Sequence, residues 1–360
     1  MAYLCSMSIK RDIRALSLEE ISAILKEKGE PAFRAKQVWE WLWQKSARSF
    51  DDMSNLSKNL RTILNENFVI NAVSIDEMQL SSDRTIKCAM KLHDGNVVES
   101  VLIPTPNRMT ACISTQVGCS LTCKFCGTGR LARLRNLNAD EIVDQVVLVN
   151  NLAKEKYQQH LNNIVYMGMG EPLLNYSQTM RSIERITSPD GLGMSPQRIT
   201  LSTAGIAKMI KKLGDDNVKF NLALSLHAAN DEKRNHIMPI NEQNSLESLA
   251  EALTYFYQKT GTRVTFEYIA FKDFNDSIKD AQELADFCRK VPAKVNIIEY
   301  NPIDDGEFKQ TTPERLEAFK AFLEKKGIIV NIRRSRGKDI DAACGQLANK
   351  NKTAGAISKK

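Results

Sequence analysis

Three cysteines lie within eight residues of the segment GCSLTCKFCGTG, at a spacing typical of metal ligands. The thiolates of Cys119, Cys123 and Cys126 could hold three irons of a cubane iron–sulfur cluster, which leaves the fourth iron without a protein ligand. An open coordination position is typical of a metal centre that binds a substrate or cofactor. The alternative is a zinc ion completed by a histidine or a distant cysteine, although none of the four histidines lies near the triplet. The spacing therefore favours the cluster.

Two further cysteines, Cys112 and Cys344, occupy segments where a thiol could react. Cys112 alternates with Ser114 and Gln116 in TACISTQ, so the three side chains share one face of a strand. Cys344 lies beside Gly345 in DIDAACGQL and follows the basic run RRSRGK, which would favour a thiolate if it lay close in space. The residues alone favour an inert thiol for each of the two. The same interpretation applies to Cys5, Cys88 and Cys288.

Polar residues recur where successive strand-like runs end. They are Glu171, Ser202, His227, Glu267 and Asn301. In βα barrels the carboxyl ends of the strands carry the active site, so the recurrence indicates one shared cavity. In LALSLH, Ala223, Ser225 and His227 take the face opposite to the leucines, as expected for a strand with one side toward a cavity. For any single residue, ordinary loop polarity is the alternative.

The elements that must position these residues begin at about residue 108, where strand-like runs start to alternate with amphipathic helices. The runs are TACIST, NIVYMG, RITLST, KFNLALSLH, RVTFEYI, KVNIIEY and, last, IIVNIR. Between the first two lies NADEIVDQVVLVNNLAKEKY, which has a capping box of Asn138 and Glu141. About six consecutive βα units predict an α/β protein with a parallel sheet, most simply a full or partial barrel.

The N-terminal part of the sequence has different patterns, which predict a helix and a hairpin. SLEEISAILKEKG predicts a helix that begins with a capping box at Ser17 and ends at Gly29. In TIKCAMKLHDGNVVESVLI, alternating strands flank Asp94-Gly95, which predicts a hairpin. We expect four parts: a helical domain over 1–70, a β-hairpin extension over 71–107, the barrel over 108–348 and a disordered basic tail over 349–360.

Composition places the chain among cytoplasmic globular proteins. No apolar run approaches the roughly 20 residues that a membrane span requires, and the N-terminus has no apolar core of a signal peptide. Structural disulfides are rare in that compartment, so the eight cysteines are better explained as ligands, redox groups or core thiols. The net charge of +7 is compatible with a nucleic-acid partner, but a solvated enzyme surface would also account for it.

The triplet and its place after the first barrel strand resemble the radical S-adenosylmethionine (SAM) superfamily, in which SAM chelates the open iron. YMGMGEP resembles the loop that binds the SAM amino group. At a finer level the chain resembles the RlmN family, from about residue 17 to residue 348. The segments that carry this match are FRAKQVWEWLWQK, FDDMSNLSKNLR, ISTQVGCSLTCKFCGTG, VYMGMGEPLLNY, ITLSTAG, LALSLHAANDEKRNHIMPIN, FEYI, YNP and RRSRGKDIDAACGQL.

The resemblance implies a fold, a substrate and cofactors. The fold is an incomplete βα barrel with an N-terminal helical domain, an RNA-binding accessory over 1–70, and a small β extension. The activity is methylation of adenine C2 in 23S ribosomal RNA, at the peptidyl-transferase centre, and in the anticodon loop of transfer RNA, next to the anticodon. The cofactors are one 4Fe–4S cluster on Cys119, Cys123 and Cys126, and two SAM molecules per turnover. A reductant such as flavodoxin is implied, with no membrane and no stable protein partner.

The resemblance also implies residue roles. Cys344 carries the methyl group, from which a 5′-deoxyadenosyl radical takes a hydrogen before the carbon adds to C2. Glu99 accepts the C2 proton. Cys112 then attacks the Cys344 sulfur and releases the product through a transient Cys112–Cys344 disulfide. The residues implied to bind SAM are Gly170, Glu171, Ser202, Ser225, Leu226, His227 and Asn301.

The sequence departs from the family pattern at one place and leaves two alternatives open. Ala132 and Arg133 stand where a glycine and an aromatic residue are expected, which affects the local geometry of the loop. One alternative is a Cfr-type enzyme that methylates adenine C8, and the other is a non-catalytic, zinc-bound RNA-binding protein.

Phosphate contacts are expected from two clusters of basic residues, although a solvated basic face would also explain these clusters. The clusters are Arg130, Arg133 and Arg135, and Arg333, Arg334 and Arg336.

Overall fold

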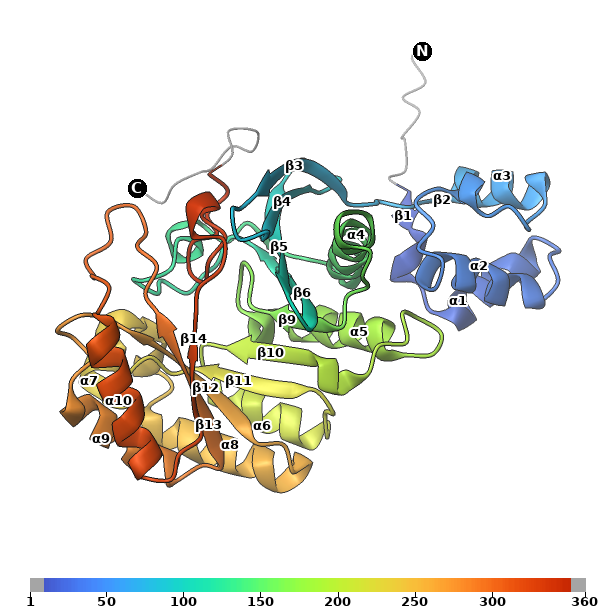
Figure 1. Cartoon of the computed structure of the whole chain (residues 1–360). Coiled ribbons are helices and arrows are strands. Elements are labelled where there is room, and N and C mark those ends of the chain that lie inside the picture. The colour runs from blue at the N-terminus through green and yellow to red at the C-terminus, as the bar shows by residue number, and fades with distance from the viewer. Residues whose placement is uncertain (1–9, 351–360) are drawn as a thin grey trace, which may run out of the picture.

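A ten-stranded mixed sheet forms the centre of the computed structural model, which describes residues 10–350 (Figure 1). The strand order is β14-β13-β12-β11-β10-β9-β6-β5-β4-β3. Neighbours from β6 to β14 are parallel, whereas β3 to β6 pair in antiparallel fashion. The strands are β3 (Ser74–Leu80), β4 (Ile86–Lys91), β5 (Val97–Thr105), β6 (Arg108–Cys112), β9 (Asn163–Tyr166), β10 (Ile199–Thr203), β11 (Asn221–Ser225), β12 (Val264–Ala270), β13 (Ala293–Glu299) and β14 (Val330–Arg333).

The parallel half is a βα barrel that does not close. Each of the seven strand-like runs of the sequence forms a strand, and each strand pairs with the next one along the chain. One edge of this half ends at β14, and the other continues into the antiparallel strand β5. The predicted α/β class and the incomplete barrel are confirmed.

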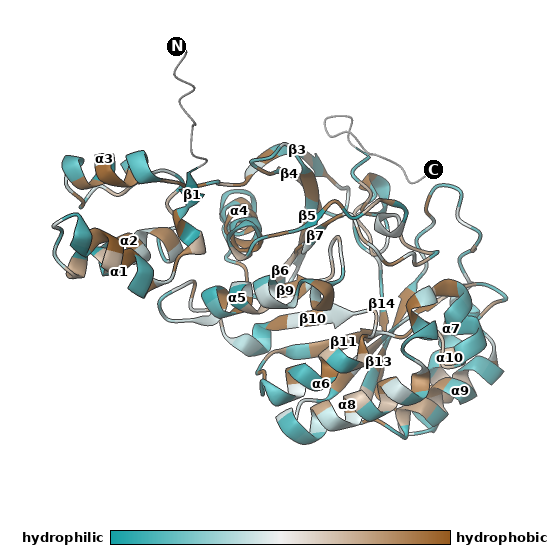
Figure 2. Cartoon of the chain, turned by 180° about the vertical axis from the view of Figure 1, so that it is seen from behind, coloured by the Kyte–Doolittle hydropathy of each residue, from teal (hydrophilic) through white to brown (hydrophobic). Residues whose placement is uncertain are grey.

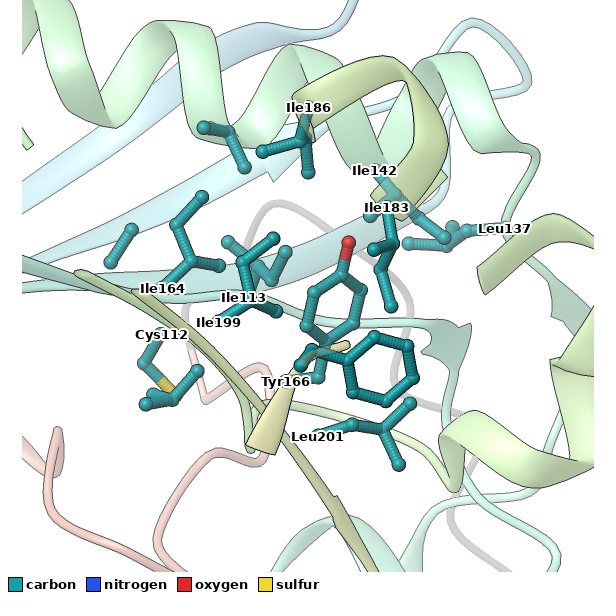
Figure 3. Close-up of a cluster of buried hydrophobic side chains, with 14 of the residues drawn as sticks. Cys112, Ile113, Leu137, Ile142, Ile164, Tyr166, Ile183, Ile186, Ile199 and Leu201 are labelled. Carbon is teal, nitrogen blue, oxygen red and sulfur yellow. The ribbon is translucent and has the colours of Figure 1, made fainter. Parts of the chain in front are cut away.

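Amphipathic helices cover the outer face of the barrel strands, with hydrophilic residues on their outward sides (Figure 2). Their apolar sides form a continuous core with the sheet. Figure 3 shows part of it, in which Ile113, Ile164 and Tyr166 lie with Ile142 and Ile183. The helices are α4 (Ala139–Tyr157), α5 (Tyr176–Thr187), α6 (Ala207–Asp215), α7 (Asp231–Ile237), α8 (Leu246–Thr260), α9 (Ile278–Cys288) and α10 (Pro313–Lys325).

A helical N-terminal domain lies beside α4 (Figure 1). The capping box expected at Ser17 is present, because its side chain accepts from the Glu20 amide while the Glu20 carboxylate accepts from the Ser17 amide. Arg14 joins the domain to α4 through ion pairs with Asp140 (3.2 Å) and Asp144 (2.9 Å). The elements are β1 (Arg11–Asp12), α1 (Leu18–Glu27), α2 (Phe33–Trp43), α3 (Lys58–Asn67) and β2 (Phe68–Val69).

The β extension continues the central sheet instead of forming a separate hairpin. The predicted hairpin at Asp94-Gly95 is present between β4 and β5, and Gly95 has φ +82°. β3 adds a strand that the sequence analysis missed, and β5 pairs with β6, the first barrel strand. The extension is therefore hydrogen-bonded directly to the strand that carries Cys112.

The C-terminal end of the described chain is bound to the protein. The Asn349 amide donates to Glu99, and Lys350 pairs with Asp341 (2.9 Å) and Asp304 (3.0 Å). The rest of the expected basic tail, 351–360, lies outside the described residues, as does Cys5. Within residues 10–350, no helix is both long enough and apolar enough to cross a membrane.

Candidate active site

The cysteine triplet lies in a loop, 118–134, whose base is held by two short strands. β7 (Gln116–Val117) pairs with β8 (Arg135–Asn136) in antiparallel fashion. Gly118 has φ +73°, and a Cβ there would lie 2.0 Å from the carbonyl oxygen of Ala132. Glycine alone permits this approach. Ala132, where the sequence departs from the family pattern, therefore lies at the neck of the loop.

All three cysteines of the triplet line one cavity, the inner cavity. Burial raises the pKa of Cys123, and the charges of Cys126 and Cys119 raise it further, so the sulfurs are near enough to repel one another as thiolates. Bound iron would offset that repulsion. Among the described residues, no group of three His, Cys, Asp or Glu side chains converges on a single metal ion. A cubane does not require convergence, because each thiolate holds its own iron.

The loop YMGMGEP forms a wall beside the triplet. Gly168, Gly170 and Glu171 line the inner cavity, and Gly170 has φ +96°, a conformation that other residues rarely adopt. Glu171 is 3% exposed, and its carboxylate accepts from the amides of Leu173 (3.0 Å) and Ala204 (2.8 Å). Burial raises the pKa of Glu171 even though these amides oppose the effect. The carboxylate thus fixes the shape of the loop while it faces the cavity.

Two side chains that the sequence analysis did not assign to this loop hold it in place. Ser114 Oγ accepts from the Met169 amide (2.8 Å), and Gln116 Oε1 accepts from the Glu171 amide (2.8 Å). The sequence placed Ser114 and Gln116 only on the strand face of Cys112. Their alternation with Cys112 was the available signal, but the partner loop could not be inferred from it. Both are positioning residues for the glycine loop.

Residues at the ends of β10 and β11 form the next part of the wall. Ser202, Ser225 and His227 line the inner cavity, and the two serine hydroxyls lie 3.4 Å apart. His227 Nδ1 accepts from the Ile269 amide (3.1 Å), which leaves the proton of the neutral ring on Nε2. Burial lowers the pKa of His227 to about 3, with a smaller contribution from Arg234. The imidazole is therefore neutral near neutral pH.

Leu226 and Asn301 are close to this site but do not line the inner cavity. Leu226 is fully buried, and its amide donates to the Glu267 carbonyl (3.0 Å). Asn301 is 3% exposed, and its Nδ2 donates to the Cys344 carbonyl (3.3 Å). Its Oδ1 is buried and has no hydrogen-bond partner among the described residues. The three thiols and the glycine loop, which do line the inner cavity, are the groups that fit the cluster and SAM.

Cys344 reaches the inner cavity from the C-terminal segment. Nη2 of Arg333 donates to its Sγ at 3.3 Å, and Nη1 of Arg333 donates to Glu267 Oε2 at 3.3 Å. The other oxygen of Glu267 accepts from Asn296 Nδ2 (2.8 Å). The basic run before Cys344 is thus close to it in space. A guanidinium held at this distance stabilises negative charge on the sulfur.

Cys112 opens into an adjoining cavity of about 460 Å³, the outer cavity, which Cys126 and Cys344 also line. Burial and, to a smaller extent, the charge of Cys344 raise the pKa of Cys112 to about 12, although Arg333 opposes the effect. Cys112 is therefore a neutral thiol near neutral pH. Both Cys112 and Cys344 are free thiols, and they are within electrostatic reach of each other.

Cys88 and Cys288 line neither cavity. Cys88 is fully buried in β4, and Cys288 is partly buried at the end of α9. Burial raises the pKa of each to about 12. Both are neutral thiols in apolar surroundings, which is the condition expected of inert core cysteines.

Glu99 lines neither cavity, although the resemblance implies that it meets the substrate. It is 1% exposed on β5, and its Oε2 accepts from the amides of Ala348 (2.9 Å) and Asn349 (3.0 Å). Its Oε1 lies 3.4 Å from Nζ of Lys87. The structure therefore places Glu99 behind the C-terminal segment, apart from the walls that carry Cys112 and Cys344.

Four of the six arginines expected to contact phosphates have carboxylate partners. Arg135 pairs with Glu141 (2.8 Å), and Arg334 pairs with Glu299 (2.8 Å). Arg334 and Arg336 line the outer cavity, where they add positive charge to its wall. The cluster before Cys344 thus lines the outer cavity, whereas the other cluster lines neither the inner nor the outer cavity.

Two family models match the chain. The model described as "Ribosomal RNA large subunit methyltransferase N-terminal domain" matches residues 12–70, and the model "Radical SAM superfamily" matches residues 113–288. The first covers the N-terminal helical domain, and the second covers the cysteine triplet and the barrel as far as α9.

Curated relatives match almost the whole chain. A probable dual-specificity RNA methyltransferase RlmN of Cytophaga hutchinsonii is 60% identical over 97% of this chain and 98% of its own length. The dual-specificity RNA methyltransferase RlmN of Nitratidesulfovibrio vulgaris is 45% identical over 93% of this chain and 94% of its own length. Among solved structures, a radical SAM methyltransferase from Sphaerobacter thermophilus is similar with a TM-score of 0.88 and 38% identity, over 94% of this chain and 99% of that one.

Proposed function

The chain belongs to the RlmN family of radical SAM RNA methyltransferases, and we propose that it methylates C2 of adenine in 23S ribosomal RNA and transfer RNA. One observation carries the proposal: Cys344, in contact with Arg333, reaches the cavity that the cysteine triplet lines. The proposed target sites are the peptidyl-transferase centre and the anticodon loop, next to the anticodon. The test is the identity of the methylated nucleoside.

Membership of the radical SAM superfamily implies a 4Fe–4S cluster and SAM. Bound together, they supply the methyl group and the one-electron chemistry that activates it. Cys119, Cys123 and Cys126 would ligate three irons. The residues that would surround SAM are Gly170, Glu171, Ser202, Ser225, Leu226, His227 and Asn301, of which Leu226 contributes its buried backbone. We propose two SAM molecules per turnover, because the methyl group and the hydrogen acceptor are consumed separately.

The chemistry of adenine C2 explains why a methyl-carrying cysteine is required. C2 is an electron-poor aromatic carbon with an inert C–H bond, so it cannot displace a methyl group from a sulfonium. A thiolate can, and Cys344 next to Arg333 is the nucleophile proposed for that step. Once methylated, Cys344 presents its S–CH3 carbon to the cavity. After loss of a hydrogen atom, that carbon forms the bond to C2.

Release of the product is proposed to depend on Cys112. Addition of the carbon radical to C2 joins the adenine to the protein through the Cys344 sulfur. The adduct must then lose the C2 proton to a base and one electron, which the bound cluster would accept. Cys112 attacks the Cys344 sulfur as a thiolate, the electron pair of the broken S–C bond leaves with the CH2 carbon, which takes up a proton to become the methyl group, and a Cys112–Cys344 disulfide remains. A reductant such as flavodoxin would restore both thiols. The shared outer cavity supports this pairing.

The substrate adenine must leave its stack to reach Cys344 inside the protein. Loop adenines are suited to this because the energetic cost of unstacking is small. The outer cavity, with Arg334 and Arg336 on its wall, is the proposed entry for the base and its phosphates. The curated relatives described above carry the RlmN name, so the Cfr-type C8 alternative is not favoured.

A further inference from the structure

The segment that carries Cys344 is bound on one side to the cysteine-triplet loop. We call residues 344–349 the C-terminal strap. The Gly127 amide donates to the Gly345 carbonyl (2.7 Å), and Thr128 Oγ1 donates to the Leu347 carbonyl (2.6 Å). Gly127 and Thr128 follow the last cysteine of the triplet directly. The strap thus holds Cys344 against the loop of the proposed cluster ligands.

The other side of the strap is held by Glu99 (Figure 1, where the red C-terminal segment lies next to β4 and β5). Oε2 of Glu99 accepts from two consecutive strap amides, those of Ala348 (2.9 Å) and Asn349 (3.0 Å). The Asn349 side chain also donates to the Val97 carbonyl (2.7 Å). Glu99 through its side chain and Val97 through its carbonyl thus bind the strap from positions two residues apart on β5.

A lysine pairs with the Glu99 carboxylate in its buried position. Lys87 on β4 lies 3.4 Å from Oε1, and the two side chains are 4% and 1% exposed. Oε1 makes no hydrogen bond among the described residues and faces Lys87 instead. A buried carboxylate paired on one oxygen and bonded to two amides on the other is held rigidly by all three partners.

We infer that Glu99 is a positioning residue that fixes the strap and, through it, the methyl-accepting sulfur of Cys344. The inference rests on the proposed role of Cys344 as methyl carrier. While the strap is in place, Ala348 and Asn349 cover the carboxylate, and Glu99 lines neither cavity. In this arrangement Glu99 acts before any RNA is bound, whereas an acceptor of the C2 proton acts only after adenine has reacted.

Methylation of Cys344 without RNA separates the two roles. Each protein is incubated anaerobically with SAM in the absence of RNA, and methylated Cys344 is measured by peptide mass spectrometry. The proteins compared are wild type, Glu99→Ala and Glu99→Gln. Ala348→Pro removes one strap amide while it leaves the carboxylate intact. Asp280→Asn is the matched control, because Asp280 is also a buried carboxylate that pairs with a lysine, Lys233, and accepts from a backbone amide. Hydrogen exchange at residues 348 and 349 is measured on the same proteins.

Glu99→Ala is expected to slow Cys344 methylation by about tenfold or more and to raise exchange at Ala348 and Asn349 by a similar factor. Glu99→Gln keeps an oxygen for both amides and is expected to stay within about threefold of wild type. Ala348→Pro should slow methylation, whereas Asp280→Asn should leave it unchanged. Iron content identifies variants that do not bind the cluster, and thermal unfolding identifies variants that do not fold.

Two results overturn the inference. One is wild-type methylation and wild-type exchange in Glu99→Ala, together with loss of RNA turnover, which would return Glu99 to the role of proton acceptor. The other is protected amides at residues 348 and 349 in Glu99→Ala, since the strap would then be held without the carboxylate. If wild type itself leaves Cys344 unmethylated, the proposed function fails. The exchange measurement still decides whether Glu99 holds the strap.

Discussion

The guanidinium of Arg333 bridges the sulfur of Cys344 and the carboxylate of Glu267, at 3.3 Å from each. Arg333 is thereby held by an anionic partner on one side and presents its charge to the sulfur on the other. The nearby Cys344 and Glu267 charges raise the pKa of Arg333 against the opposing effect of burial. A thiolate is the form that accepts a methyl group in the proposed function, and the guanidinium lies within hydrogen-bonding distance of the sulfur that would carry this charge.

Arg333→Gln is expected to slow methylation of Cys344 by about 10- to 100-fold, because a hydrogen bond to a charged group contributes roughly 1.5–3 kcal/mol. Arg333→Lys keeps the charge but not the planar fork, so its effect should be smaller. Peptide mass spectrometry of RNA-free reactions measures the rate. Arg334→Gln is the control, since Arg334 pairs with Glu299 instead of Cys344. Equal rates of Cys344 methylation in Arg333→Gln and wild type would show that Arg333 does not activate this cysteine.

Cys112→Ala is expected to trap the protein covalently on RNA. In the proposed mechanism the steps up to carbon–carbon bond formation do not use Cys112, whereas release requires its thiolate. Denaturing electrophoresis after anaerobic reaction should reveal an RNA-linked band, which nuclease treatment removes. Cys344→Ala should give neither the band nor methylated RNA. Turnover by Cys344→Ala would show that a different residue carries the methyl group.

The reactivity of Cys112 should rise steeply with pH. Burial raises its pKa to about 12, so the thiolate is the minor form throughout the neutral range. Below the pKa, the thiolate fraction grows about tenfold per pH unit. Alkylation of Cys112, followed by peptide mass spectrometry, should therefore accelerate by nearly that factor per unit between about pH 7 and 10. A plateau that begins near pH 7 would show that a charged neighbour lowers the pKa far more than burial raises it.

Serine at any one of Cys119, Cys123 or Cys126 is expected to lower bound iron and sulfide strongly and to abolish RNA methylation. Anaerobically purified wild type should be brown, with iron and sulfide in stoichiometric amounts. The exchange of Cys288 for serine is the control, because Cys288 lines neither cavity. Colourless wild-type protein with one zinc per chain would instead support the non-catalytic alternative.

The barrel could be predicted because each strand carries its own signal. Runs such as NIVYMG and KVNIIEY are short, apolar and flanked by amphipathic helices, and those local patterns fix both the element type and the chain order. β3 was missed because its seven residues alternate between exposed and partly exposed positions, which gives no apolar face to recognise. An edge strand of this kind depends on its partner β4 for its conformation.

The candidate site was predictable only in part, for a similar reason. The triplet is a local motif, so its spacing alone indicated a cluster. The contact of Arg333 with Glu267 and the bond of Glu99 to Ala348 join residues far apart in the chain. The spacing of residue types along the sequence does not predict such pairs, because they depend on how β5, β12 and the C-terminal segment pack in three dimensions.

Methylation of adenine C2 is tested by mass spectrometry of nucleosides from RNA that has been incubated anaerobically with the protein, SAM and a reductant. The expected product is 2-methyladenosine in 23S ribosomal RNA and in transfer RNA, with none in a parallel reaction with Cys344→Ala. 8-Methyladenosine would keep the cysteine chemistry but contradict the proposed position of methylation. No methylated adenosine, from protein that has full iron and sulfide, would contradict the proposed function itself.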